Sequence, residues 1–242
     1  MKSLAELADF YETDKAINGH GYVKYYDGYF SILRNSCKSL LEIGVQEISG
    51  KKYGAASLRM WEDYFLNANI YGIDIRDLTH LSKNRVKVYQ SSQLDFASLK
   101  NILTDINLKP EIIIDDGSHA PDDQQQTFEY LFDYLAPGGF YVVEDIAEWN
   151  FYKSSSGFVF DPDKQNIYGD ENNIPFVHTS LINQNPLFMV SSLSVFSNFC
   201  FTGKIKSHFI ENTEKLEQSI QYINIHASNQ LNQYIAVIKK IP

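Results

Sequence analysis

Two short acidic segments hold the residue types best suited to chemistry. The first, Asp115-Asp116-Gly117-Ser118-His119, directly follows the apolar run Ile112-Ile113-Ile114, and the second, Glu144-Asp145, follows the apolar run 140–143. Carboxylates that converge without basic neighbours repel one another, and a bound cation relieves this repulsion. Ligation by oxygen atoms is the preference of Mg²⁺, with Mn²⁺ or Ca²⁺ as alternatives, whereas zinc prefers Cys and His. The pattern therefore indicates a divalent-cation site.

His119 adds a group that can move a proton. It lies three residues after Asp116, and an unperturbed imidazole titrates at about pH 6.5, so it can accept a proton at neutral pH. A metal ion that binds a hydroxyl group lowers the pKa of that hydroxyl and helps the transfer. Two simpler interpretations remain open. The first segment is only a polar turn, or one acid of each pair caps the next segment while the other faces solvent.

The elements that must position these residues are predicted to be strands of a parallel sheet. Apolar runs rich in β-branched residues, without polar alternation, are typical of strands covered on both faces. Five such runs alternate with helical spacing, which predicts an α/β fold with a doubly wound, mostly parallel Rossmann-like sheet. Ligands bind beyond the carboxyl ends of strands in such sheets, and neighbouring strands lie about 4.8 Å apart, so the two acidic pairs can converge. The expected strands are 38–45, 69–75, 85–89, 112–114 and 140–146.

Asp74 marks a second position at this edge of the sheet. It lies near the end of the predicted second strand, and the first strand runs into Glu42-Ile43-Gly44. A carboxylate can accept hydrogen bonds from both hydroxyls of a ribose, so a glycine turn followed by this acid indicates a nucleoside. The glycine signal alone is weak, because it lacks the Gly-x-Gly-x-x-Gly pyrophosphate fingerprint.

The remaining segments read as additions to one domain of residues 1–242. Ser3 and Glu6 predict a capped helix over 3–12, and Ser57 is expected to cap the helix that begins at Leu58. Residues 13–22 read as a connector loop, and 23–36 as a helix. The irregular stretch 150–185 is interpreted as a lid rather than a disordered segment. Strand-like stretches are expected in 187–204, a helix over 213–223 and a last strand over 234–238.

Bulk composition excludes several classes of partner. The 242 residues carry a formal net charge of −9, which argues against binding to nucleic acid or to an anionic membrane. With only Cys37 and Cys200 there is no disulfide framework, so a reducing, cytoplasmic location is expected. No apolar signal core or run of about 20 apolar residues is evident, so no membrane span is expected.

Five motifs in order resemble a known family. They are Glu42-Ile43-Gly44-Val45, Ser57-Leu58-Arg59-Met60-Trp61, Ile70–Ile75, Ile114–His119 and Gly138–Asp145. Together they are similar to the class I S-adenosylmethionine-dependent methyltransferases, and specifically to the metal-dependent sugar O-methyltransferases of macrolide biosynthesis. The resemblance covers roughly residues 12–146. It implies a methyltransferase fold with an N-terminal helical cap (1–36), a core that binds cofactor and metal (38–146), and an acceptor lid (150–185) inserted after the fifth strand.

The resemblance also implies individual roles. Mg²⁺ is expected to bind Asp116, Glu144 and Asp145, with His119 as general base and Asp116 as part of the catalytic group. Asp115 either faces the cofactor or fixes the turn. The residues expected to contact S-adenosylmethionine are Glu42, Gly44, Ser57, Asp74, Ser92, Gln93 and Asp115. The segments Thr13-Asp14-Lys15 and His20-Gly21-Tyr22 resemble the part of the family that closes over the cofactor, which argues against a simple connector.

The sequence departs from the family pattern in two loops. Ser91-Ser92-Gln93 stands where relatives often have Gly-Asp-Gln, and Gln46-Glu47-Ile48 where glycines are usual. Neither change removes a catalytic residue, but the first removes a carboxylate expected near the adenine. Adenine binding would then depend on Gln93 and on backbone groups.

The resulting hypothesis is an Mg²⁺-dependent O-methyltransferase that acts on a sugar hydroxyl of a natural product or surface polysaccharide. One alternative keeps the methyl transfer but places it on a phosphate- or phosphoramidate-type oxygen, which Mg²⁺ readily binds. Others are a metal-dependent nucleotide hydrolase or phosphotransferase, and a nucleoside-binding module without catalysis. The aromatic-rich N-terminal segment favours self-association into a homo-oligomer.

Overall fold

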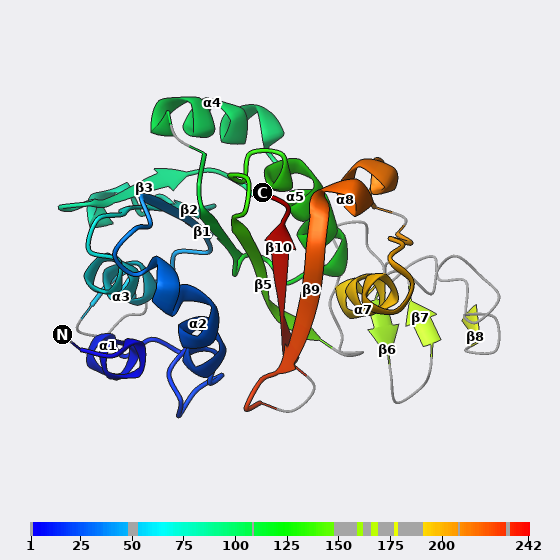
Figure 1. The fold of residues 1–242 in the computed structure, drawn as a ribbon, viewed down its shortest axis with the longest axis horizontal. Helices are drawn as coiled ribbons and strands as arrows, with labels where there is room; N and C mark the ends of the chain where they lie inside the picture. Colours follow the sequence, from blue (N-terminus) through cyan, green and yellow to red (C-terminus); the bar gives the residue numbers. More distant parts are fainter. Residues whose placement is uncertain are drawn as a thin grey trace.

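Seven strands form one sheet in the computed structural model, which describes residues 2–47, 53–107, 109–147, 159–161, 166–168, 177–178, 191–207, 209–230 and 233–242. Their spatial order is β3 (Val86–Gln90), β2 (Asn69–Asp74), β1 (Ser39–Ile43), β4 (Ile112–Asp115), β5 (Phe140–Ala147), β10 (Gln233–Lys240) and β9 (Ile220–Ala227) (Figure 1). The first five run parallel. β10 and β9 are antiparallel to their neighbours. The predicted parallel core is confirmed.

Helices cover both faces of this sheet. One face packs against α1 (Leu4–Tyr11), α2 (Val23–Phe30) and α3 (Ala56–Tyr64). The other packs against α4 (Phe96–Ile106), α5 (Pro121–Phe132), α7 (Ser192–Thr202) and α8 (Thr213–Ser219). Figure 1 shows α4 on the opposite side of the strands from α1 and α3. Short 3-10 turns at Ser31–Leu33 and Thr79–Leu81 complete the core region.

The central strands alternate between two hydrophobic cores. Ile112 and Ile114 belong to the core beneath α1–α3, whereas Ile113 belongs to the core beneath α4, α5 and α7. Each of these three side chains is fully buried, and burying one is worth about 1.5–3 kcal/mol. This burial on both faces is why the run carries no polar alternation.

The N-terminal helix has the predicted cap, and α3 does not. Ser3 and Glu6 form the reciprocal capping box of α1. Helix α3 begins at Ala56 after Ala55, whose φ of 54° is left-handed. Ser57 therefore lies inside the first turn, and its predicted role as N-cap is wrong.

Sequence reading was least accurate in the C-terminal third. The strand-like stretch in 187–204 is wrong in its described part, because Ser192–Thr202 form α7 with Ser191 as its cap. The helix expected over 213–223 ends at Ser219, and strand β9 begins at Ile220. Short apolar runs do not distinguish a buried helix from a strand by periodicity. The last strand is confirmed but is longer, Gln233–Lys240.

The predicted lid over 150–185 falls mostly outside the described residues. Its described parts are β6 (Val159–Asp161), β7 (Asn166–Tyr168) and β8 (Val177–His178), which form a separate antiparallel sheet. Its role as a lid stays a prediction. In the described part of the chain, every helix is too short or too polar to cross a membrane.

Candidate active site

The ends of β1 and β4 lie so close together that only glycine fits at position 44. Gly44 has a φ of 90°, and a Cβ there would lie 1.8 Å from the backbone oxygen of Asp116. The Asp116 N–H donates to the carbonyl of Ile43 at 3.0 Å. Glycine is the residue for which this backbone conformation and this close approach carry no steric penalty. The Glu-Ile-Gly motif thus fixes Asp116 beside the end of β1.

A bulge in β5 brings the neighbouring acids Glu144 and Asp145 to one site. The register with β10 shifts here, so both residues lie opposite the single residue Ile235. Asp145 also has a left-handed φ of 50°. Consecutive side chains of a regular strand point to opposite faces, and a bulge redirects them. The bulge therefore allows both carboxylates to serve the same edge of the sheet.

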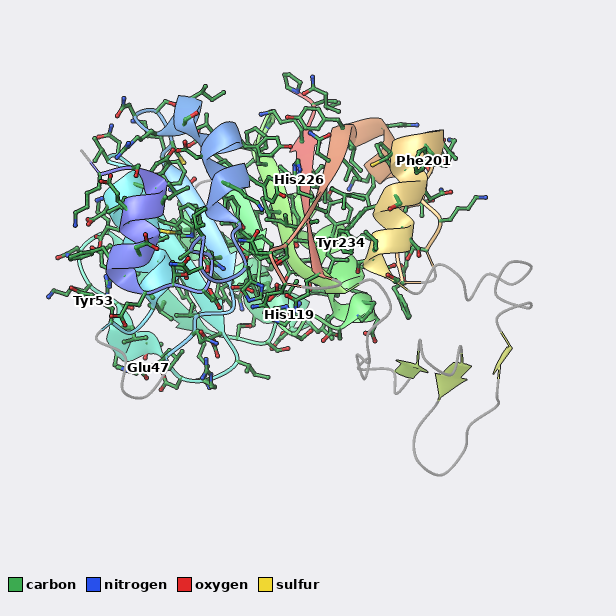
Figure 2. The ribbon with its side chains drawn as sticks, turned by 90° about the horizontal axis from the view of Figure 1, so that it is seen from below. Glu47, Tyr53, His119, Phe201, His226 and Tyr234 are labelled. Atoms are coloured by element: carbon green, nitrogen blue, oxygen red, sulfur yellow. The ribbon has the colours of Figure 1, made fainter. Side chains whose placement is uncertain are left out.

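Asp116, His119 and Asp145 converge into a cluster. One ligand atom from each lies within 4.8 Å of the others, and all three residues are partly buried. His119 Nε2 lies 3.7 Å from Asp145 Oδ2. His119 has a φ of 60°, a left-handed conformation that histidine adopts more readily than most residues. In Figure 2 His119 lies below Tyr234 and to the right of Tyr53.

The loop between α1 and α2 is part of this site. Lys15, only 1% exposed, donates through Nζ to Asp116 Oδ2 at 2.6 Å and to Glu144 Oε2 at 2.9 Å. Its Nζ also lies 3.6 Å from Glu42 Oε1. Burial lowers the pKa of a lysine, but here Asp116, Glu144 and Glu42 together raise the pKa of Lys15 well above its usual value. The loop thus places a fixed positive charge among three carboxylates.

Glu144 is enclosed by protein donors. Its Oε1 accepts a hydrogen bond from the hydroxyl of Tyr26, and its Oε2 accepts the bond from Lys15. Burial raises the pKa of Glu144 well above its usual value, although the Lys15 charge opposes the shift. The predicted role of Glu144 as a metal ligand stays a prediction, and in this structure its carboxylate lies against Lys15 rather than in the cluster of Asp116, His119 and Asp145.

Asp145 is held by two other residues of the same loop region. The Tyr22 hydroxyl donates to Asp145 Oδ1 at 2.6 Å, and His20 Nδ1 lies 3.1 Å from the same oxygen. Burial alone would raise the pKa of Asp145, but these contacts outweigh it and lower the pKa to about 2. Asp145 is therefore ionised throughout the physiological range.

Replacing Tyr22 with phenylalanine should remove one of these contacts and raise the pKa of Asp145. A depressed carboxylate pKa adds stability above its unfolded value of about 4, and this stability is lost as the pH falls through the folded value. The variant should be less stable by roughly 1.5 kcal/mol above pH 4. The difference should shrink as the pH falls towards 2, where Asp145 titrates in the native protein.

Urea unfolding at a series of pH values measures this difference. Tyr25→Phe is the matched control, because its hydroxyl bonds the carbonyl of Ala227 and lies against no carboxylate of the cluster. If the stability difference between Tyr22→Phe and the native protein is the same at every pH, the Tyr22 hydroxyl does not lower the pKa of Asp145.

Two cavities meet at Asp74. One, of about 350 Å³, is lined by Ser57, Asp116, His119 and Asp145 as well as by Asp74. The other, of about 290 Å³, is lined by Ser91, Ser92 and Gln93 on the opposite side of Asp74. The two cavities thus share the residues Gly44, Asp74, Arg76 and Gly117 in their walls, one extending to the acidic cluster and the other to the Ser92-Gln93 loop.

The chain is similar to known methyltransferases in sequence and in fold. The chain is 38% identical over 160 residues to mycinamicin VI 2''-O-methyltransferase of Micromonospora griseorubida, covering 66% of this chain and 39% of that protein. It is 35% identical over 165 residues to demethylmacrocin O-methyltransferase of Streptomyces fradiae, covering 68% and 41%. The chain also resembles a solved structure of MycE methyltransferase from the mycinamycin biosynthetic pathway in complex with Mg and SAH. The match covers 99% of this chain and 55% of the MycE chain, with a TM-score of 0.70 and 27% sequence identity.

The chain is a homologue of these O-methyltransferases. It spans less than half of the length of these curated relatives. No protein-family model matches it. The predicted resemblance and the class I methyltransferase fold are both confirmed.

In this methyltransferase homologue most predicted site residues line the two cavities, and three do not: Glu42, Asp115 and Glu144. Glu42 lies beneath them and accepts a hydrogen bond from Trp61 Nε1 at 2.6 Å. Burial raises its pKa to about 7, against the opposing charge of Lys15. Asp115 accepts a hydrogen bond from the N–H of Gly117 at 3.2 Å. That contact favours the turn-fixing role of Asp115 over contact with the cofactor.

Sequence reasoning gave Lys15, His20 and Tyr22 no individual roles in this homologue. The only signal was the resemblance of their segments to the family, and the first interpretation as a connector loop was wrong. Local spacing does not reveal such a role, because Lys15 lies 101 residues from Asp116 and 129 from Glu144 along the chain.

Proposed function

We propose that this homologue is an Mg²⁺-dependent O-methyltransferase that transfers the methyl group of S-adenosylmethionine to a hydroxyl of a sugar. The observation that carries the proposal is the convergence of Asp116, His119 and Asp145 on a cavity that continues to Asp74. The cavity thereby brings together metal-binding carboxylates, a general base and the carboxylate expected to bind the ribose.

The residues present fit the cofactor. Asp74 lies where the two cavities meet, so a ribose bound there has space on either side for an adenine and for an amino-acid chain. We assign the adenine to the side of Ser92 and Gln93, since the other side leads to the acidic cluster. Gln93 already bonds Thr127 and the N–H of Ser118, which fixes its position at the cavity wall.

The residues present also fit a divalent cation. Asp116 and Asp145 offer carboxylate oxygens, the ligand type that Mg²⁺ prefers. Burial raises the pKa of Asp116 even though the Lys15 charge opposes the shift, and a bound cation would favour the ionised form of this carboxylate. Asp116, Asp145 and, by family resemblance, Glu144 are the proposed ligands. When bound, the ion would lower the pKa of an acceptor hydroxyl.

The chain's own residues supply the other steps. Asp74 orients the nucleoside through the ribose hydroxyls. His119, whose Nε2 faces Asp145, accepts the hydroxyl proton. The deprotonated oxygen forms a bond to the methyl carbon while the carbon–sulfur bond breaks, which leaves a neutral thioether. Positioning of both reactants at the end of the sheet provides much of the rate enhancement.

The sugar acceptor is inferred from the relatives. A related MycE structure is described in complex with Mg, SAH and mycinamycin VI, with 27% identity and a TM-score of 0.68. We propose a sugar hydroxyl of a natural product or polysaccharide for this chain, bound under the segment 150–185. The domain division into cap, core and lid, self-association, and a cytoplasmic location free of nucleic-acid or membrane partners belong to the same proposal.

Methyl transfer with and without a chelator tests this function, together with calorimetric titration of S-adenosylhomocysteine. We expect binding of S-adenosylhomocysteine and turnover that is lost with chelator or with Asp116→Asn. Nucleotide consumption without affinity for S-adenosylhomocysteine would instead support a hydrolase. Cofactor binding without turnover on any sugar acceptor would support a binding module.

Arg76 should weaken cofactor binding in the native protein. Its guanidinium bonds both carboxylate oxygens of Asp74, at 3.0 and 3.1 Å, and a ribose diol needs the same oxygens. The Arg76 side chain is 53% exposed, and exposed ion pairs are worth at most about 1 kcal/mol. Arg76→Ala should therefore bind S-adenosylhomocysteine two- to fivefold more tightly, roughly, by calorimetry. Weaker binding would mean that Arg76 positions Asp74 instead.

A further inference from the structure

Lys15 is buried in the middle of the acidic site, although lysine is among the residues least often buried. Its ammonium contacts Asp116 of the loop after β4, Glu144 of β5 and Glu42 of β1, at 2.6, 2.9 and 3.6 Å. These carboxylates come from three neighbouring strands. An ammonium so placed replaces water with three charged partners, which is the condition under which a buried charge is tolerated.

The backbone of the loop holds Lys15 in this position. The carbonyl of Lys15 accepts a hydrogen bond from the N–H of Val23, the first residue of α2, at 3.1 Å. Its own N–H donates to the hydroxyl of Thr13 at 3.4 Å. Since both ends of the loop are anchored, the side chain enters the cluster from a defined direction. The positive charge is thus part of the fold.

Lys15 and the proposed metal ion use the same ligands. Two of the three predicted metal ligands, Asp116 and Glu144, accept hydrogen bonds from Lys15 Nζ. The third, Asp145, is held by Tyr22 and His20. Two cations that share carboxylates divide the available negative charge and repel each other. Their affinities for the cluster are therefore coupled.

We propose that Lys15 is an internal cation that competes with the divalent metal ion for Asp116 and Glu144, and so sets how tightly the active site holds that ion. This inference rests on the proposed metal-dependent function, in which Lys15 is a positioning residue. Lys15 stabilises the carboxylates when no metal is bound. The contacts of Lys15 with Asp116 and Glu144 also link the loop between α1 and α2 to the metal site.

Metal binding itself tests this role, without any activity measurement. Lys15→Met keeps the length and apolar stem of the side chain and removes the charge. By isothermal calorimetry with Mg²⁺ and Mn²⁺, we expect this variant to bind at least about tenfold more tightly than the native protein. Its thermal midpoint without metal should fall, and the rise on adding Mg²⁺ should exceed that of the native protein.

Two control variants define the effect. Lys15→Arg keeps the charge and should bind Mg²⁺ like the native protein. Lys24→Met removes an exposed lysine that bonds Asn229, and should leave Mg²⁺ binding unchanged. If Lys15→Met does not fold, Lys15→Met/Glu42→Gln removes one charge of each sign and is compared with Glu42→Gln alone.

The outcomes separate this inference from the proposed function. Tighter Mg²⁺ binding by Lys15→Met, with both controls unchanged, supports it. Equal or weaker binding, with the thermal midpoint lowered by the same amount with and without Mg²⁺, would overturn it and leave Lys15 a structural ion pair. Absence of Mg²⁺ binding by the native protein would overturn the proposed metal dependence and this inference together.

Discussion

His119→Ala should lower turnover by about 10²- to 10⁴-fold, the usual contribution of a positioned general base. His119 faces Asp145 and lines the cavity, and the proposed mechanism gives it the proton of the acceptor hydroxyl. Affinity for S-adenosylhomocysteine should not change, since Asp74 and the Ser92-Gln93 loop hold that part of the ligand. Single-turnover methyl transfer at saturating cofactor measures the chemical step directly.

The same variant distinguishes a base from a metal ligand. Because Mg²⁺ prefers oxygen ligands, a base at position 119 predicts that Mg²⁺ affinity in His119→Ala stays within about twofold of the native value. His80→Ala is the control, since His80 is exposed and contacts only Glu47 among the described ion pairs. A large loss of Mg²⁺ affinity would assign His119 to the metal, and undiminished turnover would remove it from the mechanism.

Asp74→Ala should weaken binding of S-adenosylhomocysteine by roughly 10²-fold. A hydrogen bond to a charged group contributes about 1.5–3 kcal/mol, and a ribose offers two hydroxyls to this carboxylate. The side chain is 7% exposed, so little water can replace it. Calorimetric titration measures the loss, and methyl transfer should show a raised KM for the cofactor with a smaller change in kcat.

Asp77→Ala is the matched control for this variant. Asp77 lies three residues further along, is exposed, and accepts hydrogen bonds from Thr79. Its loss should leave cofactor affinity unchanged. Equal affinities of Asp74→Ala and the native protein would remove the nucleoside assignment, and with it the argument that the two cavities form one cofactor site.

The sequence by itself determined the parallel core and the location of its chemistry. Buried β-branched runs such as Ile112–Ile114 read as strands because both faces of the sheet are covered. A polar residue at the end of such a run must lie at the carboxyl edge of the sheet, so the sequence alone predicts the positions of Asp74 and Asp116. Periodicity failed in the C-terminal third, where α7 packs against α5 and β9 pairs with β10.

Only the tertiary structure decided which acids face which partners. The bulge at Glu144 and Asp145 arises from pairing with β10, about ninety residues later in the chain, and at the same edge of the sheet Glu144 contacts Lys15 whereas Asp145 contacts Tyr22 and His20. Lys15 became part of the site because the loop after α1 folds over the ends of three strands. Contacts between residues so distant in sequence leave no local pattern, since they follow from how packed elements bring loops together.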